Sequence, residues 1–315
     1  MTTTSTAAPK APLRIVPDGP FSLAAAANFG FGPNSGRPTY GDAQMRLAFP
    51  TDDFQHYAHV LLGQDADGTV TGSIESDGDP AAITAQVGRI LSLNGSGTDW
   101  LRAGERDPVL GARLREYPGL RPVSFHSPYE AAAWSIISAR RQRSQGTVVR
   151  NRIAQALGRA YGEGKDQLLA FPTPARLLEL SDIQGLEAVK VQRLHAVAHA
   201  ALDGELDSDL LLGMDTDAAM AHIQKLPGIG PTYATLILLR STGSIDGMTG
   251  FEPRLQTYLG HFYELGGAAT ETQVAEIMAG WRPFRTWSSV LFRVSGDRLG
   301  LELPASPGRG DRLRR

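Results

Sequence analysis

The stretch Leu226–Pro231, with the sequence LPGIGP, combines residue types that suit phosphate binding. Gly228 and Gly230 flank one apolar residue, and glycine adopts positive φ and allows another backbone to come close. Pro231 suits the first turn of a helix, and residues 216–224 predict a helix that ends before the glycines. The sequence therefore predicts two helices joined by a glycine hairpin, and the free N–H groups at the start of the second helix suit a phosphate. A tight turn without a ligand is the alternative.

Further motifs precede and follow the hairpin in a consistent order. They are Ser127-Pro128-Tyr129-Glu130, Trp134-Ser135-Ile136-Ile137, Phe171-Pro172-Thr173-Pro174, Gly185-Leu186 with Lys190-Val191-Gln192-Arg193, and Trp281-Arg282-Pro283-Phe284-Arg285. With these motifs, the chain from about Pro118 to Leu299 resembles the helix-hairpin-helix DNA glycosylases, in particular the 3-methyladenine DNA glycosylase II family. The resemblance implies a mostly α fold with two helical lobes around a cleft, and a small antiparallel α+β lobe at the N-terminus.

Glu252 stands where the family has an aspartate, which stabilises the positive sugar that forms as the base leaves. An anion beside an oxocarbenium-like transition state lowers the barrier, so the resemblance implies that Glu252 is catalytic and lies in the cleft, with Gly228 and Gly230 at its rim. Glutamate is longer than aspartate, and a displacement of about 1 Å can cost on the order of 10²-fold in rate. Because Glu252 directly precedes Pro253, a carboxylate favoured by the helix dipole is the alternative. Asp246, the nearest other acid, is interpreted as a turn residue.

Thr232 stands where glycosylases that also cut the DNA strand have a lysine. A lysine forms a Schiff base and threonine does not, so the resemblance implies a monofunctional enzyme that uses water.

A flipped base needs an aromatic surface in its pocket. Family members of the glycosylase II type place pocket aromatics at positions that align with Thr232, Leu236 and Arg293. Other aromatic candidates for the base pocket are Tyr129, Trp134, Tyr233 and Trp287. Core packing is the alternative for each, and we prefer it for Trp134. Either the pocket uses different aromatics, or the substrate is not a typical electron-poor alkylated purine.

Arg140, Arg141 and Arg143 lie in a turn between two predicted helices, and residues 134–160 contain six arginines and no acid. In the family this turn carries a wedge that fills the gap left by the flipped base, and a planar guanidinium can stack there. The arginines could instead hold phosphates or form a solvated turn. Because no acid lies nearby in the sequence, we expect them to contact DNA.

The resemblance also implies a structural Na⁺ or K⁺ at the hairpin, held by the backbone carbonyls of Gln224, Leu226 and Ile229. We expect no other cofactor. His195 and His199 are spaced to chelate a metal from one helix face, but no third ligand is evident and a packed or surface helix is favoured. The chain has no cysteine, which excludes disulfides, thiolate zinc sites, cysteine nucleophiles and an iron–sulfur cluster.

The 315 residues fit two domains, or one domain with an added lobe. Residues 1–120 have 9 basic and 13 acidic side chains, hence −4, and residues 121–315 have 22 and 20, hence +2, which gives the overall −2. The acidic balance of the first part suggests a scaffold, and the second part suits a local cationic face. The sequence shows neither a long apolar run nor an apolar signal region. We therefore expect a cytoplasmic, nucleoid-associated protein that binds double-stranded DNA, with no membrane contact and no obligatory protein partner.

Composition predicts a disordered tail at 1–17, an α+β lobe at 18–100, a helical region at 101–303 and a basic tail at 304–315. Within the lobe, strands are predicted at 46–49, 56–62 and 69–74 and a helix at 80–93. Further helices are predicted at 129–139, 145–161, 174–180, 189–203, 215–224, 231–240, 253–263, 270–281 and 286–293.

The favoured function is a monofunctional DNA glycosylase that hydrolyses the N-glycosidic bond of an alkylated or otherwise modified base in duplex DNA, in base excision repair. One alternative is a non-catalytic DNA-binding protein on a glycosylase scaffold. The other is a glycosylase for an unusual modified base.

Overall fold

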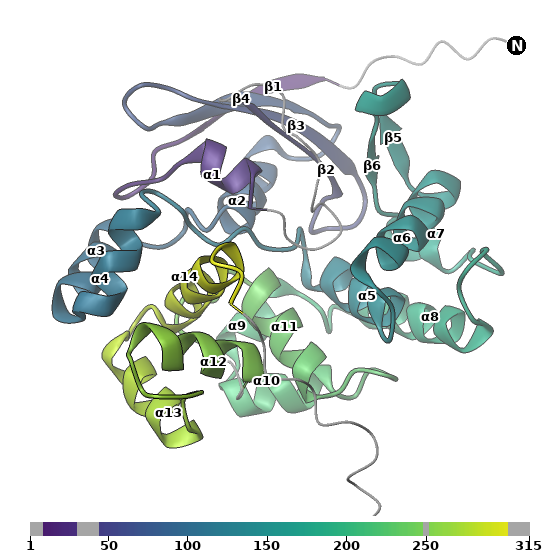
Figure 1. Ribbon diagram of the computed structural model, residues 1–315. Coiled ribbons are helices and arrows are strands. Elements are labelled where there is room, and N and C mark those ends of the chain that lie inside the picture. Colours follow the sequence, from purple (N-terminus) through teal and green to yellow (C-terminus); the bar gives the residue numbers. More distant parts are fainter. Residues whose placement is uncertain (1–8, 30–43, 248–251, 302–315) are drawn as a thin grey trace, which may run out of the picture. The chain divides into compact units, whose positions relative to one another are not determined.

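The computed structural model describes residues 9–29, 44–247 and 252–301, and the chain forms two compact units (Figure 1). The first unit comprises Met1–Gly97 and Gly119–Ser244, and the second comprises Thr98–Pro118 and Ile245–Arg315. Each unit therefore contains segments that are far apart in the sequence, and each is described by itself below. The predicted tail at 304–315 lies outside the described residues.

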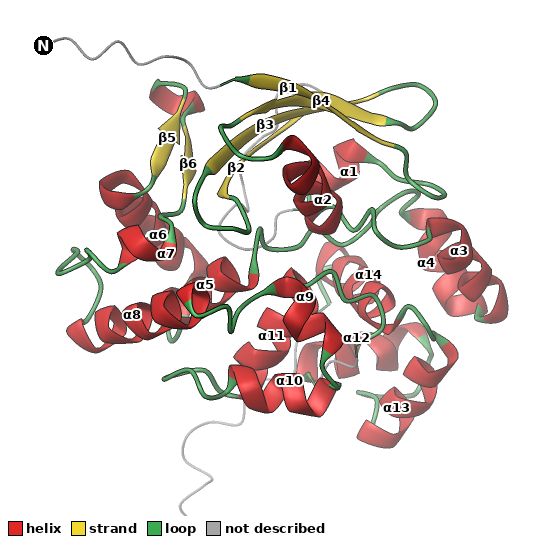
Figure 2. Cartoon of the chain, turned by 180° about the vertical axis from the view of Figure 1, so that it is seen from behind, coloured by secondary structure: helices red, strands yellow, loops and turns green. Residues whose placement is uncertain are grey.

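The first unit contains a four-stranded antiparallel sheet in the order β1-β4-β3-β2. Its strands are β1 (Lys10–Ile15), β2 (Gln44–Pro50), β3 (Tyr57–Gln64) and β4 (Val70–Glu75). Helices α1 (Leu23–Ala27) and α2 (Pro80–Ile90) lie on the same face of this sheet (Figure 2). Asp79 starts α2 by accepting hydrogen bonds from the N–H groups of Ala81 and Ala82, and Pro80 takes the first helical position. The three strands and the helix predicted for this region are confirmed.

Strand β1 corrects the prediction of a disordered tail at 1–17. Residues 10–15 pair with β4 from Lys10 opposite Glu75 to Ile15 opposite Val70. Leu13 is buried in the core beneath the sheet. The Pro- and Ala-rich composition suggested disorder, but the edge of β4 supplies hydrogen-bond partners that composition does not reveal. Residues 1–8 lie outside the described part of the chain.

Helix α5 (Pro128–Ser138) is the centre of the first unit's helical part. Every residue from Pro128 to Ile137 is buried, and α5 packs against α6 (Arg143–Leu157), α8 (Ala188–Leu202) and α11 (Pro231–Ser241). A helix that is buried on all sides and composed mostly of apolar residues is typical of such a central position. The remaining helices of this part are α7 (Pro174–Leu177), α9 (Ser208–Gly213) and α10 (Thr216–Ile223). The helices predicted here are confirmed, whereas α9 was not predicted.

A two-stranded sheet, β5 (Arg159–Tyr161) and β6 (Leu168–Ala170), interrupts the helical region. Because the sequence predicted a helix as far as Tyr161, the end of that helix was wrong. Gly158 ends α6 in an extended conformation, and a Cβ there would overlap the backbone oxygen of Ala170. Glycine is therefore required at this position by the close approach of β6.

The second unit consists of α3 (Gly97–Arg106), α4 (Pro108–Glu116), α12 (Pro253–Phe262), α13 (Glu271–Gly280) and α14 (Arg285–Arg298). Its centre is aromatic: Trp281 stacks on Phe292 at 5.0 Å between ring centroids, and Trp287 packs edge-on against Trp100 at 5.1 Å. Asp107 ties these helices together, because its carboxylate accepts from the hydroxyl of Tyr263 and from Trp281 Nε1. Burial and the hydrogen bond to Asp107 raise the pKa of Tyr263 well above its ordinary value. The three helices predicted after residue 252 are confirmed, whereas α3 and α4 were not predicted.

The fold is mostly α with a small antiparallel sheet, as the sequence predicted. Among the described helices, none is both long enough and apolar enough to cross a bilayer.

Candidate DNA-binding and catalytic residues

The predicted glycine hairpin joins α10 and α11 in the first unit. Gly228 has φ of +89°, a region that favours glycine, and the N–H of Ile229 donates to the carbonyl of Leu226 at 3.1 Å. Gly230 precedes α11 in an extended conformation, and its carbonyl accepts from the N–H of Ala234 at 2.9 Å. Leu226 and Ile229 are buried, whereas Gly228 and Gly230 are exposed. The apolar residues therefore anchor the turn in the core, and the glycine backbone remains accessible.

Arg193 on α8 lies against this hairpin. A Cβ at Gly228 would be 2.8–2.9 Å from the Cδ, Nε and Nη1 atoms of Arg193. A guanidinium thus lies next to the turn proposed to hold a phosphate, and such a group binds phosphate well. The sequence analysis used Arg193 only as part of a family motif. No pattern in the sequence connects it with Gly228, because Arg193 lies in α8 and Gly228 lies in the turn between α10 and α11.

The three arginines at the turn between α5 and α6 differ in exposure and in hydrogen-bond partners. Arg140 is exposed and has φ of +60°, whereas the Arg141 side chain is only 14% exposed. Arg141 donates to the carbonyls of Ile137 and Gly185, both at 2.8 Å, and to Glu187 Oε2 at 2.7 Å. The expectation that no acid lies near these arginines is therefore wrong for Arg141, because Glu187 approaches it from a distant part of the sequence.

Lys190 strengthens the same contact between α5 and α8. Its Nζ donates to the carbonyl of Ala139 at 2.8 Å, and burial lowers the pKa of the ammonium. Cations at the C-terminal end of a helix interact favourably with its carbonyls and dipole. Arg141 and Lys190 thus fix the end of α5, and Arg140 and Arg143 are the exposed arginines of the turn.

Glu252 lies at the start of α12 in the second unit. Its backbone carbonyl accepts from the N–H of Gln256 at 3.0 Å, but its side chain makes no capping hydrogen bond. Instead, Glu252 Oε2 lies 3.2 Å from Arg293 Nη1 on α14. The two side chains are 34% and 37% exposed, respectively. The carboxylate therefore pairs with a neighbouring helix and does not cap its own. Its place at the N-terminus of α12 also suits the helix dipole, so that alternative remains open.

Asp246 has a larger role than the turn residue that the sequence suggested. Its carboxylate oxygen Oδ1 accepts from the backbone N–H of Arg285 at 3.1 Å and from Arg285 Nε at 2.9 Å, and Oδ2 accepts from Nη2 at 3.0 Å. The backbone N–H of Gly247 donates to Thr286 Oγ1 at 2.9 Å. These contacts attach the segment before Glu252 to the start of α14. Residues 248–251 lie outside the described part of the chain.

The predicted base-pocket residues differ widely in exposure. Tyr129 is fully buried and donates to the carbonyl of Pro172 at 2.9 Å, and Trp287 is 1% exposed within the aromatic centre of the second unit. As placed, neither ring has a free face for an incoming base, so the interpretation of these two residues as pocket residues is corrected to core packing. Thr232 is exposed, and Tyr233 and Leu236 are half-buried against the core.

Trp134 also lies in the core, as preferred from the sequence. His195 Nε2 donates to the carbonyl of Leu180 at 2.9 Å, so this histidine has an internal partner. Gly228 and Gly230 belong to the first unit and Glu252 belongs to the second. The cleft that would bring the hairpin and the carboxylate together therefore stays a prediction.

Comparisons with known proteins address the class of protein. No protein-family model matches the chain. A DNA-3-methyladenine glycosylase of Bacillus subtilis is 21% identical over 218 residues, covering 67% of this chain and 72% of the relative. A probable bifunctional transcriptional activator/DNA repair enzyme AlkA of Mycobacterium tuberculosis is 26% identical over 214 residues, and the match spans 42% of that protein. Among solved structures, a 3-methyladenine DNA-glycosylase from Archaeoglobus fulgidus aligns with a TM-score of 0.73 at 17% identity, covering 92% of this chain and 99% of the other.

The fold is that of the helix-hairpin-helix DNA glycosylases. The sequence relatives support the resemblance to the 3-methyladenine DNA glycosylases that the motifs suggested.

Proposed function

We propose that the protein is a DNA glycosylase that removes a modified base from duplex DNA by hydrolysing its N-glycosidic bond, as a step of base excision repair. Relatives and structural neighbours named as DNA glycosylases support this proposal, and one solved neighbour is an 8-oxoguanine glycosylase/lyase in complex with double-stranded DNA. The observation that carries it is the Glu252 carboxylate, which lies at the start of α12 without capping it. A chain with this fold and such a carboxylate has the anionic group that the reaction requires.

The chemical role of Glu252 is electrostatic. As the bond between C1′ and the base nitrogen breaks, positive charge develops on the sugar, and a fixed carboxylate stabilises this charge more than it stabilises the neutral ground state. Water then adds to C1′. The backbone of Gly228 and Gly230 at the hairpin, Arg193 beside it, and Arg140 and Arg143 on the α5–α6 turn supply the groups for DNA phosphates.

The proposed enzyme releases the base and leaves the strand intact. Thr232 stands where strand-cleaving relatives have a lysine, and it has no amine for a Schiff base. Lys190, on α8 of the same unit, is buried and donates to backbone carbonyls. Reduction with borohydride should therefore trap no covalent complex with DNA that contains the substrate base.

The hairpin also suits a monovalent cation. The carbonyls of Gln224, Leu226 and Ile229 belong to the short segment between α10 and α11, and neutral oxygen donors suit Na⁺ or K⁺. Leu226 O accepts one hydrogen bond from Ile229, and a carbonyl has a second lone pair for an ion. The ion would stiffen the turn and add positive charge next to a bound phosphate.

A DNA-binding protein without catalytic activity is the second candidate. The observation that favours it is the ion pair with Arg293, which offsets the charge of the Glu252 carboxylate.

Base release from duplex DNA distinguishes the two candidates. Duplexes each carrying one lesion are incubated with excess protein, and abasic sites are then cleaved with hot alkali. A glycosylase produces cleavage at the lesion only after alkali, for at least one lesion of an alkylated, deaminated and oxidised panel. Binding of every duplex without any abasic site would contradict the enzyme and support the second candidate.

A further inference from the structure

The guanidinium of Arg293 is a second charged group beside the proposed catalytic carboxylate of Glu252. One guanidinium nitrogen of Arg293, Nη1, lies 3.2 Å from the carboxylate, and the side chain is 37% exposed. A guanidinium has five N–H donors and no acceptor. The contact through Nη1 therefore leaves donors on Arg293 for a ligand that approaches from solvent.

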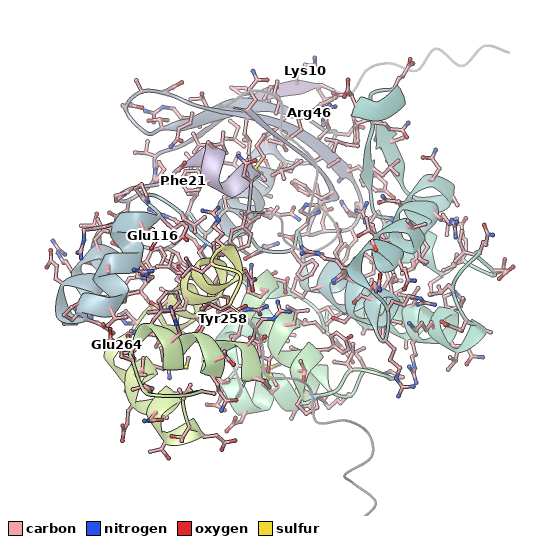
Figure 3. All side chains as sticks on the ribbon, in the orientation of Figure 1. Lys10, Phe21, Arg46, Glu116, Tyr258 and Glu264 are labelled. Carbon is pink, nitrogen blue, oxygen red and sulfur yellow. The ribbon has the colours of Figure 1, made fainter. Side chains whose placement is uncertain are left out.

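The other charges near Arg293 are already matched to each other. Asp297, one helical turn further along α14, accepts from the hydroxyl of Tyr258, which Figure 3 labels on α12. Arg254 Nη1 lies 3.7 Å from the same carboxylate. Arg293 thus forms an ion pair with Glu252, whereas Asp297 forms an ion pair with Arg254 and accepts a hydrogen bond from Tyr258. The two acids and two arginines form two separate pairs at the ends of two neighbouring helices.

We propose that Arg293 selects the base, and that the substrate class is a neutral, oxygen-bearing purine and not a cationic alkylated purine. This inference rests on the proposed function. The sugar carbon and the base nitrogen that separate in the reaction are directly bonded. A group that stabilises charge on the sugar and a group that stabilises charge on the base must therefore lie a few ångströms apart. The 3.2 Å separation of Glu252 and Arg293 satisfies this requirement.

The charge balance of the reaction supports this assignment. When the glycosidic bond breaks, both bonding electrons leave with the base. A cationic base therefore departs neutral and needs little help, whereas a neutral base departs with negative charge until it takes a proton from the water that adds to C1′. The N–H donors of Arg293 stabilise this developing negative charge, as preorganised donors do elsewhere. In the same position, a fixed guanidinium repels a base that is already positive.

The burial of two of the predicted pocket aromatics, Tyr129 and Trp287, agrees with this selection. An aromatic face attracts a cation, but Tyr129 and Trp287 are buried in their respective cores. Position 293, where the resemblance places a pocket aromatic, holds an arginine instead. A cationic base thus loses an attractive surface there and meets a like charge.

The test compares two purines that share the 6-oxo group but differ in charge. Duplexes containing hypoxanthine, which is neutral, or 7-methylguanine, which is cationic, are incubated with excess protein, and single-turnover rates of base release are measured. Wild type should release hypoxanthine faster. Arg293→Met should slow hypoxanthine release by roughly tenfold or more and leave 7-methylguanine release unchanged or faster.

Arg254→Met is the matched control, because Arg254 is a similarly exposed arginine, at 40%, whose ionic partner is Asp297. It should keep the wild-type ratio of the two rates. Arg293→Lys keeps the charge without the planar fork and should lie between wild type and Arg293→Met. A ratio unaffected by Arg293→Met, with active protein, would overturn the role of Arg293 alone. If wild type releases no base from any lesion duplex that it binds, the proposed function and this inference fail together.

Discussion

Glu252 and Arg293 are coupled, so a change in one alters the environment of the other. In Glu252→Gln, the amide keeps the shape of the side chain but not its charge, and the guanidinium of Arg293 is left beside the developing positive sugar. We expect base release to fall by about 10²-fold or more, since a preorganised electrostatic group is typically worth that much. Affinity for duplex DNA should stay the same or rise slightly, because one negative charge is lost near phosphates. Single-turnover release and fluorescence anisotropy measure the two quantities.

Glu252→Asp is the companion variant. It restores the residue that the resemblance places here but shortens the side chain, so the 3.2 Å contact with Arg293 must lengthen or rearrange. Activity retained in the aspartate variant and lost in the glutamine variant would identify charge as the requirement. Equal release rates for wild type and Glu252→Gln would show that the carboxylate serves only the structure of the second unit.

The arginines of the α5–α6 turn should separate into two phenotypes. Replacing both Arg140 and Arg143 with alanine should weaken DNA binding and reduce the slope of log K against log salt by roughly 2, since each lost phosphate contact removes about 0.9. Arg141→Ala should instead lower the free energy of unfolding by about 1–3 kcal/mol, because the carbonyl of the buried residue Ile137 loses a donor. Salt titrations and urea unfolding distinguish the two. An unchanged slope in the double variant would show that the turn does not contact DNA.

At the residue scale, the sequence indicated which residue types matter but not what they contact. Arg141 was grouped with Arg140 and Arg143 because all three lie in one cationic segment, and Glu187 lies 46 positions away. Tyr129 and Trp287 were candidates for the pocket because aromatic rings suit either a base or a core. Only their burial decides between these roles.

The hairpin between α10 and α11 offers a prediction at the scale of an element, because its two glycines have different constraints. Gly228 has φ of +89°, and a Cβ there would lie 2.8 Å from Arg193. Gly228→Ala should therefore destabilise the protein by about 1–3 kcal/mol and displace Arg193 from the turn, which lowers DNA affinity. Thermal unfolding and anisotropy measure the two effects.

Gly230→Ala is the control for backbone strain. Gly230 has φ of −94°, which any residue adopts, and a Cβ there meets nothing within 4 Å in the described part of the chain. Stability should change by less than about 1 kcal/mol, because alanine is a poorer N-cap residue than glycine, whereas it also leaves the unfolded chain less conformational freedom. Equal destabilisation by the two substitutions would mean that the conformation of Gly228 is not what constrains the hairpin.

Elements with a clear local signal were predicted well, and those defined by distant partners were not. The hairpin, its two helices and strands β2–β4 each carry a local pattern of turn residues or apolar periodicity. Strands β5 and β6 have only three residues each, and β1 lies in a stretch rich in Ala and Pro. The strand conformation of β1 depends on pairing with β4, up to about 65 residues away, and such strands have little signal of their own.

At the scale of the whole molecule, composition separated an α+β region from a helical region, but contacts divide the chain differently. The first unit joins the four-stranded sheet to α5–α11. Arg46 on β2, labelled in Figure 3, donates to the carbonyl of Asp166 at 3.0 Å, and the hydroxyl of Tyr57 accepts from the N–H of Thr173 at 3.0 Å. These bonds connect residues more than 100 positions apart, which a pattern along the sequence does not show.

A buried charge cluster formed by His126, Glu130 on α5 and Arg150 on α6 makes the stability of the molecule depend on pH. Burial alone would raise the pKa of Glu130, but His126 Nδ1 at 3.1 Å and Arg150 Nη2 at 3.7 Å lower it, and the pKa lies below its ordinary value of 4.5. Between pH 4.5 and the lowered pKa, Glu130 is ionised in the folded state and increasingly protonated in the unfolded state. The unfolded state thus binds more protons, and stability falls as the pH falls from about 4.5 through the lowered pKa.

Glu130→Gln should remove this contribution to the acid dependence. At neutral pH we expect a loss of about 3–5 kcal/mol in the free energy of unfolding, because Arg150 keeps its buried charge without its carboxylate partner. Below pH 4.5, however, the variant should lose stability less steeply than wild type, since a group that titrates differently in the two states is gone. Glu179→Gln is the control, because Glu179 forms a half-exposed pair with Arg176 and should change stability by less than about 1 kcal/mol. Urea unfolding between pH 3 and 7 gives the free energy of unfolding of all three proteins. If it fell equally steeply below pH 4.5 for wild type and Glu130→Gln, the role assigned to Glu130 would be contradicted.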